Sequence, residues 1–311
     1  MCCGIRVGGW LLAGLWLCGP AVLVALRADE PGSVVRTVAG TGQRGPFVVS
    51  GESLQTAVNE PFGLSMREPG VLYVCEVGGH VIRRVDLSTG RSEVVAGSGV
   101  KGYAGDGGPA TAARLNEPYE VRFDSSGSMY FVEMQNHVVR RVDGATGVIS
   151  TVAGTGVAGF SGDGGPAISA QLRQPHSIAL GDDGTLYICD IGNHRVRAVD
   201  LRTGVMRTFA GTGERKPTPD GAPIAGTPLN GPRALDFDGR GSLYLALREG
   251  NALYRMDLQR GVLQHLAGVG RSGYAGDGGP AKEALLSGPK GVAVGPDGNV
   301  YFADTESHTV R

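Results

Sequence analysis

Residue types that bind zinc recur at fixed places along the chain. Carboxylates occupy one repeated position and histidines another, four residues later: Glu76, Glu133, Asp190 and Asp304, then His80, His137, His194 and His308. Zinc needs its ligands about 2 Å away, so they must lie close to one another. The pairs, however, are separated by multiples of 57 residues. We therefore predict neither a metal site nor a cofactor, and expect each acid to accept hydrogen bonds from turn amides or the following arginine.

The residue that follows a repeated proline differs from one repeat to the next. After Pro61, Pro118, Pro175, Pro232 and Pro289 come Phe62, Tyr119, His176, Arg233 and Lys290. Variable residues in a constant frame are what a functional site grafted onto a scaffold would produce. The ligand-contacting residues predicted on this basis are Tyr119, Glu120, His176, Arg233 and Lys290. Of these, His176 and Glu120 are the candidate catalytic residues. The alternative is that the side chains only fill and solvate one end of a channel.

Glycine-rich loops such as Ser-Gly-Asp-Gly-Gly-Pro-Ala at residues 161–167 raise the question of phosphate or calcium binding. A phosphate loop runs from a strand into a helix, and a P-loop also carries Lys and Ser or Thr, which these copies lack. Calcium needs several oxygen ligands, whereas each loop supplies one carboxylate: Asp106, Asp163, Asp220 or Asp277. We therefore interpret the loops as structural, with glycines in positive-φ turns and the aspartate capping backbone amides.

Two cysteines lie beyond the first 28 residues, Cys75 and Cys189, and they are 114 residues apart. Equivalent positions two repeats apart do not meet the Cα separation of about 4–7 Å that a disulfide requires. The other repeats carry small apolar residues at this position: Val132, Ala246 and Ala303. We expect a small apolar slot in which both thiols are buried and free.

All these positions keep one register because the sequence itself repeats. The motif Val-Ala-Gly-Thr-Gly, or a close variant, starts 57 residues after the previous copy at Val38, Val95, Val152, Phe209 and Leu266. The same step separates the five prolines, and also the tyrosines Tyr73, Tyr130, Tyr187, Tyr244 and Tyr301. A fixed period of this length indicates a repeat architecture in which each unit packs on its neighbours.

The third unit has the pattern of four short antiparallel strands. Apolar runs at residues 177–180 and 186–189 flank a turn that ends in Gly184, and residues 195–199 and 205–210 flank another. Four-stranded units at even spacing are typical of the blades of a β-propeller. A solenoid is the alternative, although solenoid periods usually include helix or are shorter. We predict an all-β propeller with four-stranded blades.

The run QPHSIALGDDGTLYICDIGNHRVRAVDLRTG resembles the NHL repeat, whose pattern is roughly P-x-G-I-A-V, D-x-D-G, L-Y-V-A-D, N-H-R-V and V-A-G-T-G. The resemblance covers residues 34–311. The unit at Pro232 departs from it, because Leu247, Asn251 and Tyr254 replace the acid, the histidine and the arginine. The glycine-rich insertions are similar to those of secreted bacterial NHL proteins and of the related module in teneurins. Propellers of this family usually have six blades.

We expect five blades in the chain. The fifth unit stops at Arg311 after its second strand, so we expect an incomplete last blade, an apparently truncated C-terminus and six blades in the full-length chain. Residues 33–40 are predicted to form a lone outer strand that completes the last blade, as N-terminal strands often do in closed propellers. Closure with five blades is the alternative.

The first 28 residues predict export. Arg6 precedes an apolar run at residues 10–26, and Ala28 and Asp29 form a junction that resembles a signal-peptidase site. An uncleaved N-terminal anchor is the alternative, and the only membrane contact that we expect. Removing residues 1–28 leaves 27 Lys and Arg against 30 Asp and Glu, so we expect no nucleic-acid partner. The predicted location is periplasmic, cell-surface or secreted.

We interpret the protein as a binding or protein-interaction scaffold whose loop-rimmed channel end contacts a protein, or a small-molecule or carbohydrate ligand. The rival interpretation is a lyase or lactonase that uses His176 and Glu120. The peptidyl-amidating lyase, a relative with NHL-type repeats, takes its zinc-binding histidines from the post-proline position of three blades, whereas only His176 matches here. Gluconolactonase-like and streptogramin-lyase-like activities rest on fold analogy alone.

Overall fold

The computed structural model describes residues 35–311, of which Thr37–Arg311 form one compact unit. The predicted signal peptide or anchor at residues 1–28 lies outside the described residues. In the part of the chain that the structure describes, no helix has the length and apolar character of a membrane span.

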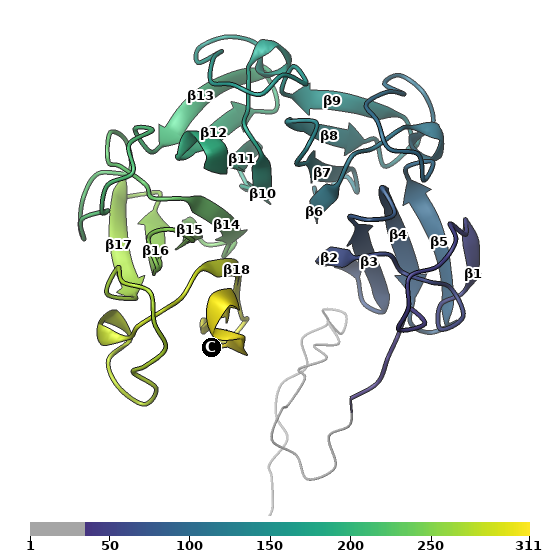
Figure 1. Ribbon diagram of the computed structural model, residues 1–311. Helices are drawn as coiled ribbons and strands as arrows, with labels where there is room; N and C mark the ends of the chain where they lie inside the picture. Colours follow the sequence, from purple (N-terminus) through teal and green to yellow (C-terminus); the bar gives the residue numbers. More distant parts are fainter. Residues whose placement is uncertain (1–34) are drawn as a thin grey trace, which may run out of the picture. The chain divides into compact units, whose positions relative to one another are not determined.

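Five antiparallel sheets follow one another along the chain as the blades of a β-propeller (Figure 1). Blade 1 contains β2 (Pro61–Glu68), β3 (Val71–Glu76), β4 (Val81–Asp86) and β5 (Arg91–Ala96), with the short β1 (Ser50–Glu52) at its outer edge. Blade 2 contains β6 (Pro118–Phe123), β7 (Met129–Glu133), β8 (Val138–Val142) and β9 (Ile149–Ala153). Blade 3 contains β10 (Pro175–Leu180), β11 (Thr185–Asp190), β12 (Arg195–Asp200) and β13 (Val205–Ala210). Blade 4 contains β14 (Pro232–Phe237), β15 (Ser242–Leu247), β16 (Ala252–Asp257) and β17 (Val262–Ala267).

Blade 5 has three strands: β18 (Pro289–Val294), β19 (Val300–Asp304) and β20 (Thr309–Val310). The helical elements of the described residues are single 3-10 turns: η1 (Ala110–Ala112), η2 (Ala167–Ser169), η3 (Ile191–Asn193), η4 (Ala281–Glu283) and η5 (Thr305–Ser307). The predicted all-β propeller is therefore confirmed. The sixth blade stays a prediction.

The Val-Ala-Gly motif marks the end of each outer strand, and its glycine has a steric cause. Gly154 has a φ of +94°, and a Cβ added to it would lie 2.3 Å from the carbonyl oxygen of His137. Equivalent glycines in blades 1, 3 and 4 have the same backbone geometry and the same close approach: Gly97, Gly211 and Gly268. Only glycine fits both the positive φ and the missing space.

The apolar core lies between successive blades. One cluster joins Cys189 and Val196 of blade 3 to Leu235, Leu243 and Leu245 of blade 4, and all five are at most 1% exposed. The inner strands β2, β6, β10, β14 and β18 contact one another in that order (Figure 1). Each blade is thus stabilised mainly by its neighbours, as in other repeat proteins.

The first and last blades each leave an apolar position uncovered. Leu64 on β2 is 56% exposed, whereas its equivalents Val121, Ile178 and Leu235 are fully buried. At the other end Tyr301 on β19 is 48% exposed, although the equivalent Tyr187 is 3% exposed. The difference arises because these two faces have no neighbouring blade among residues 35–311.

The prediction of an outer strand over residues 33–40 is wrong for its described part, since residues 35–40 form no strand. Their backbone instead bonds near blade 1: the Ser53 hydroxyl donates to the Val38 carbonyl (2.7 Å), and the Gly40 N–H donates to the Ser53 carbonyl (2.9 Å). The added strand is β1, which pairs with β5 from Ser50↔Glu93 to Glu52↔Arg91.

Candidate functional site

The repeated acids are acceptors that hold each blade together, as predicted. In blade 2 both Glu133 and Arg140 are fully buried, and Arg140 Nη1 lies 3.0 Å from Glu133 Oε1. The backbone N–H of Asn116, at the entry to the blade, donates to Glu133 Oε2 (2.8 Å). Blades 1, 3 and 5 contain the same arrangement, built on Glu76 with Arg83, Asp190 with Arg197, and Asp304 with Arg311.

The repeated histidines connect one blade to the next. His80, His137 and His194 have φ values of +52° to +57°, and Nδ1 of each accepts a hydrogen bond from a backbone N–H 37 residues later. Asn251 has φ +44° and accepts from Gly288 through Oδ1 (2.9 Å), so it replaces the histidine in blade 4. Asparagine tolerates the left-handed region. Among the described residues, no group of His, Cys, Asp and Glu is arranged to hold a metal ion.

The aspartates of the glycine-rich loops are also structural. Asp163 accepts from Arg197 Nη2 (2.8 Å) and from the Thr208 hydroxyl (2.6 Å), which ties the loop to its own blade's outer strand. Asp106 makes the matching contacts with Arg140 and with the backbone N–H of Thr151. Cys75 and Cys189 are buried and free, as predicted, and burial raises the pKa of both thiols.

The residues after the repeated prolines come together at one end of the inner strands, here called the channel mouth (Phe62, Tyr119, His176, Arg233 and Lys290). The Phe62 and Tyr119 ring centroids are 3.9 Å apart, and the Tyr119 and His176 centroids are 4.9 Å apart. The Arg233 guanidinium lies 4.9 Å from the Tyr119 centroid, and its Nη2 donates to the Tyr119 hydroxyl (2.6 Å). Residues 57 positions apart in sequence thus form one continuous surface.

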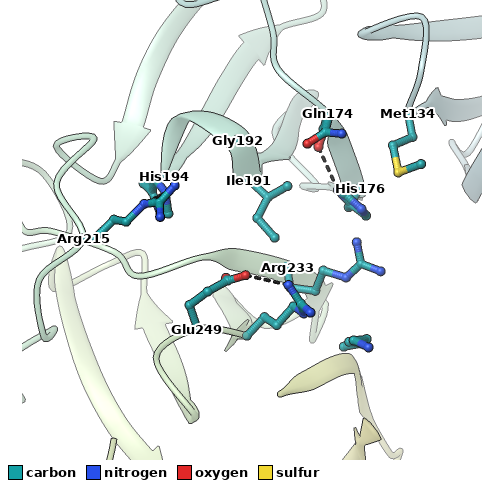
Figure 2. Close-up of a pocket in the computed structure, with 11 residues that line it drawn as sticks. Met134, Gln174, His176, Ile191, Gly192, His194, Arg215, Arg233 and Glu249 are labelled. Carbon is teal, nitrogen blue, oxygen red and sulfur yellow. Dashed lines mark hydrogen bonds and ion pairs between the residues drawn. The ribbon is translucent and has the colours of Figure 1, made fainter. Parts of the chain in front are cut away.

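Two cavities open at the channel mouth. The inner cavity, of about 210 Å³, lies among the inner strands, and all the ligand-contacting candidates line it: Tyr119, Glu120, His176, Arg233 and Lys290. The outer cavity, of about 390 Å³, shares His176, Arg233 and Lys290 with it (Figure 2). Turns and blade connections complete the outer cavity through Met134, Gln174, Ile191, Gly192, His194, Arg215, Arg248 and Glu249.

His176 and Glu120, the candidate catalytic pair, have separate partners. His176 Nδ1 lies 2.7 Å from the Gln174 carbonyl oxygen, so Nδ1 carries the proton and Nε2 is left to face a ligand. Glu120 forms an ion pair with Arg122 and a hydrogen bond with Ser177. Burial raises the pKa of Glu120 and outweighs the opposing effect of Arg122. The structure shows no hydrogen bond between His176 and Glu120, so it does not form them into an acid–base pair.

Blade 4 and the connection before it add charged residues to the mouth that were not among the residues predicted from the sequence. Arg248 occupies the position of Met134 and Ile191 in blades 2 and 3, and Glu249 follows it. Arg215 comes from the connection between β13 and β14. The available signal was the departure of this unit from the repeat pattern at Leu247, Asn251 and Tyr254. That departure falls in the same turn region as Arg248 and Glu249.

Family models match two segments of the chain. Residues 156–200 match the teneurin NHL domain, and residues 286–311 match the NHL repeat. These segments correspond to most of one repeat unit in blade 3 and to blade 5.

The chain spans less than half of the length of three similar proteins. The chain is 28% identical over 270 residues to the chloroplastic protein Suppressor of Quenching 1 of Arabidopsis thaliana, covering 82% of this chain and 25% of that protein. It is 30% identical to teneurin-1 of Mus musculus over 74% of this chain and 9% of that protein. It is 24% identical to human NHL repeat-containing protein 2, over 83% of this chain and 39% of that protein.

Solved structures share the fold at low sequence identity. The chain resembles a structure of a nidogen/laminin complex with a TM-score of 0.54 and 15% identity, over 81% of this chain and 75% of that chain. It resembles a gluconolactonase from Xanthomonas campestris with a TM-score of 0.50 and 18% identity, over 78% and 68%. Virginiamycin B lyase from Staphylococcus aureus has a TM-score of 0.50 and 14% identity, over 84% and 72%.

Proposed function

We propose that this chain, which belongs to the NHL-repeat proteins, is a binding scaffold that holds a partner protein at its channel mouth. One observation carries the proposal: five variable side chains on a constant frame converge on one pair of cavities. A scaffold that served only its own stability would need no such variation at aligned positions. The nidogen/laminin neighbour comes from a protein–protein complex, which adds a fold-level analogy.

A peptide-library selection on the immobilised protein tests this proposal. We expect selected peptides to lose binding to the mouth variant Lys290→Glu and to keep it for Arg202→Glu. Arg202 lies in the turn between β12 and β13 with its side chain 87% exposed, so it is a matched charge reversal outside the mouth. Selected peptides that bind both variants equally would place the binding surface elsewhere.

The second candidate function is a lyase or lactonase that uses His176 and Glu120. His176 lines both cavities and its Nε2 is a free acceptor, which favours it, and the ion pair of Glu120 with Arg122 disfavours it. A lactone and lyase substrate screen with and without divalent metal decides between the two functions. If an activity is found, an enzyme at this mouth requires that His176→Ala and Glu120→Ala each lower kcat by at least about a hundredfold.

We also propose that a sixth blade covers the faces that carry Leu64 and Tyr301. The support comes from the four residues at the position of Leu64 in the other blades, which are at most 9% exposed, whereas Leu64 is 56% exposed. These residues are Val121, Ile178, Leu235 and Val292. An apolar face of this kind is stabilised when a neighbour covers it.

Export of the protein is a further proposal, supported by the basic and apolar pattern of residues 1–28. Mass spectrometry of the mature N-terminus tests it. Cleavage before Asp29 supports a periplasmic, cell-surface or secreted protein, an intact leader in a membrane fraction supports an anchor, and an intact leader in the cytosol contradicts export.

A further inference from the structure

The outer cavity of the channel mouth carries an excess of positive charge. Its charged lining consists of Arg215, Arg233, Arg248 and Lys290 with a single acid, Glu249. The chain as a whole has a formal net charge of −1, so the excess is local to this cavity. A concave surface lined by one sign of charge concentrates ligands of the opposite sign.

Arg233 is the distinctive residue of this cluster. It is only 6% exposed, and burial lowers the pKa of its guanidinium, which nevertheless stays charged at any physiological pH. Its one side-chain hydrogen bond is to the neutral Tyr119 hydroxyl. Glu120 and Glu249 lie close enough to interact with its charge, but it forms no ion pair with any residue from 35 to 311. The other deeply buried arginines, Arg83, Arg140 and Arg197, each pair with a carboxylate of their own blade. A buried charge without a directly paired counter-ion is costly, and an incoming anion reduces that cost.

The other cations at the cavity are only partly neutralised. Arg248 forms an ion pair with Glu249 (2.8 Å), and Arg248 and Lys290 share one further exposed acid, Glu306, at 3.6 Å and 2.9 Å. Arg215 Nε lies 2.9 Å from His194 Nε2, while Nδ1 of the same ring accepts from the Gly231 N–H. A neutral imidazole accepts through one nitrogen, so this ring accepts from only one of the two donors at a time. In either case Arg215 Nη1 and Nη2 have no hydrogen-bond partner among residues 35–311, so they are available to a ligand.

Resting on the proposed function, we propose that the channel mouth binds an acidic segment of a partner protein, with one side-chain carboxylate seated on Arg233. Guanidinium groups bind carboxylates through two parallel hydrogen bonds. Met134 and Ile191, which line the same cavity, offer apolar contact to the neighbouring part of such a segment (Figure 2). A nucleic acid needs a longer track of positive charge than one cavity in a chain of net negative charge supplies.

Titration calorimetry with N-acetylated hexaglutamate tests the ligand class, and hexaglutamine of the same length is the neutral control. We expect hexaglutamate to bind and its affinity to fall as salt rises from 50 to 300 mM, because exposed charges are screened. Hexaglutamine should not bind. Glutarate and inorganic phosphate distinguish the other sources of negative charge. Binding of either as tightly as hexaglutamate would assign the cavity to a free small anion and overturn the proposal.

Substitutions at the mouth test where the bound hexaglutamate carboxylate lies. Arg233→Gln should weaken hexaglutamate binding roughly tenfold or more, and Arg248→Gln should weaken it several-fold, because each removes a charge-assisted hydrogen bond. Arg233→Lys should retain part of the affinity, and Arg202→Gln should leave it unchanged. If Arg233→Gln lowers the thermal midpoint too far to be used, Arg248→Gln and Lys290→Gln together decide the point. Unchanged affinity in that double variant overturns the proposal.

The outcome separates this inference from the proposed function. If neutral peptides bind at the mouth and lose binding to Lys290→Glu, the proposal of a binding scaffold is supported and the proposal of an acidic partner is contradicted. If the library contains no peptide that binds at the mouth and hexaglutamate does not bind either, both proposals are contradicted.

Discussion

At the residue scale, the positions of the repeated acid and arginine hold either an ion pair or a largely apolar pair. Blades 1, 2, 3 and 5 use a carboxylate and an arginine, whereas blade 4 has Leu247 and Tyr254 at the same positions. The Tyr254 hydroxyl donates to the Thr218 carbonyl, and so ties the preceding loop as Arg140 ties its loop through Asp106. A buried ion pair and a well-packed apolar pair are often similar in stability, although breaking one partner is costly.

This comparison predicts the result of a double-mutant cycle in blade 2. Glu133→Leu and Arg140→Tyr should each lower the free energy of unfolding by about 3–5 kcal/mol, because each leaves a buried charge without its buried partner. The double variant, which copies blade 4, should cost at least about 1 kcal/mol less than the sum of the two. Urea unfolding measures all four proteins, and the exposed pair Asp200 and Arg202 should show coupling below about 1 kcal/mol. Strict additivity at Glu133 and Arg140 contradicts the prediction.

At the element scale, the turn between the second and third strands of a blade positions its neighbour. His137 takes the left-handed conformation and accepts from the N–H of Gln174, one residue before β10 begins. The bond requires an unprotonated Nδ1. Burial is the largest cause that lowers the pKa of His80, His137 and His194, so all three stay neutral acceptors at neutral pH.

Protonation of these histidines should loosen the contacts between blades. Because their pKa is lower in the folded protein than the ordinary value of about 6.5 of the unfolded chain, the unfolded state binds more protons below neutral pH. The contribution of these histidines to stability should therefore be fully present above about pH 7 and fall as the pH drops toward 5, whereas the raised pKa values of Glu133 and Asp190 act in the opposite direction in both proteins compared below. We expect the triple variant His80→Asn, His137→Asn and His194→Asn to lose less stability over that range, since Asn251 makes the same bond without titrating. Urea midpoints at pH 7.5 and 5.0 measure the difference, and an equal loss in both proteins would falsify the assignment.

At the scale of the whole molecule, each blade depends on the two beside it. Leu64 and Leu235 are the same residue type at the same position of β2 and β14, yet one is 56% exposed and the other fully buried. The difference comes from whether a preceding blade packs on the inner strand. The same dependence places Phe62, Tyr119, His176, Arg233 and Lys290 around one mouth, because every blade contributes its second inner-strand residue.

The matched leucines provide the test of a sixth blade. Leu235→Ala should lower the free energy of unfolding by about 2–5 kcal/mol, as substitutions of buried leucine do. If a sixth blade covers β2, Leu64→Ala in the protein purified from its own cells should cost a similar amount. In the isolated segment 37–311 the same change should cost less than about 1 kcal/mol, because the side chain is largely exposed there. If Leu64→Ala leaves the free energy of unfolding unchanged in both proteins, no blade covers this face.

The period, the strands and the position of the candidate site could be predicted from the residues alone. Three motifs at a constant step of 57 residues, with turn residues between alternating apolar runs, sufficed to predict the blades and the convergence of Tyr119, His176 and Arg233 at one end of the channel. These features depend on local backbone preferences and on repetition, which a single chain displays directly. The prediction failed over residues 35–40, where the same motif forms no strand and bonds to Ser53 instead.

Which charges have partners could be learned only from the folded molecule. Arg140 and Arg233 are both buried arginines, but the first meets Glu133 seven residues away on the adjacent strand, and the second meets Tyr119 from a blade 114 residues earlier. The structure likewise brought Arg215, Arg248 and Glu249 to the mouth from the connection and the turn of blade 4, outside the post-proline position on which the prediction was based. Electrostatic energy depends on distances and burial in three dimensions, so the unpaired charge at Arg233 is visible only in the folded molecule.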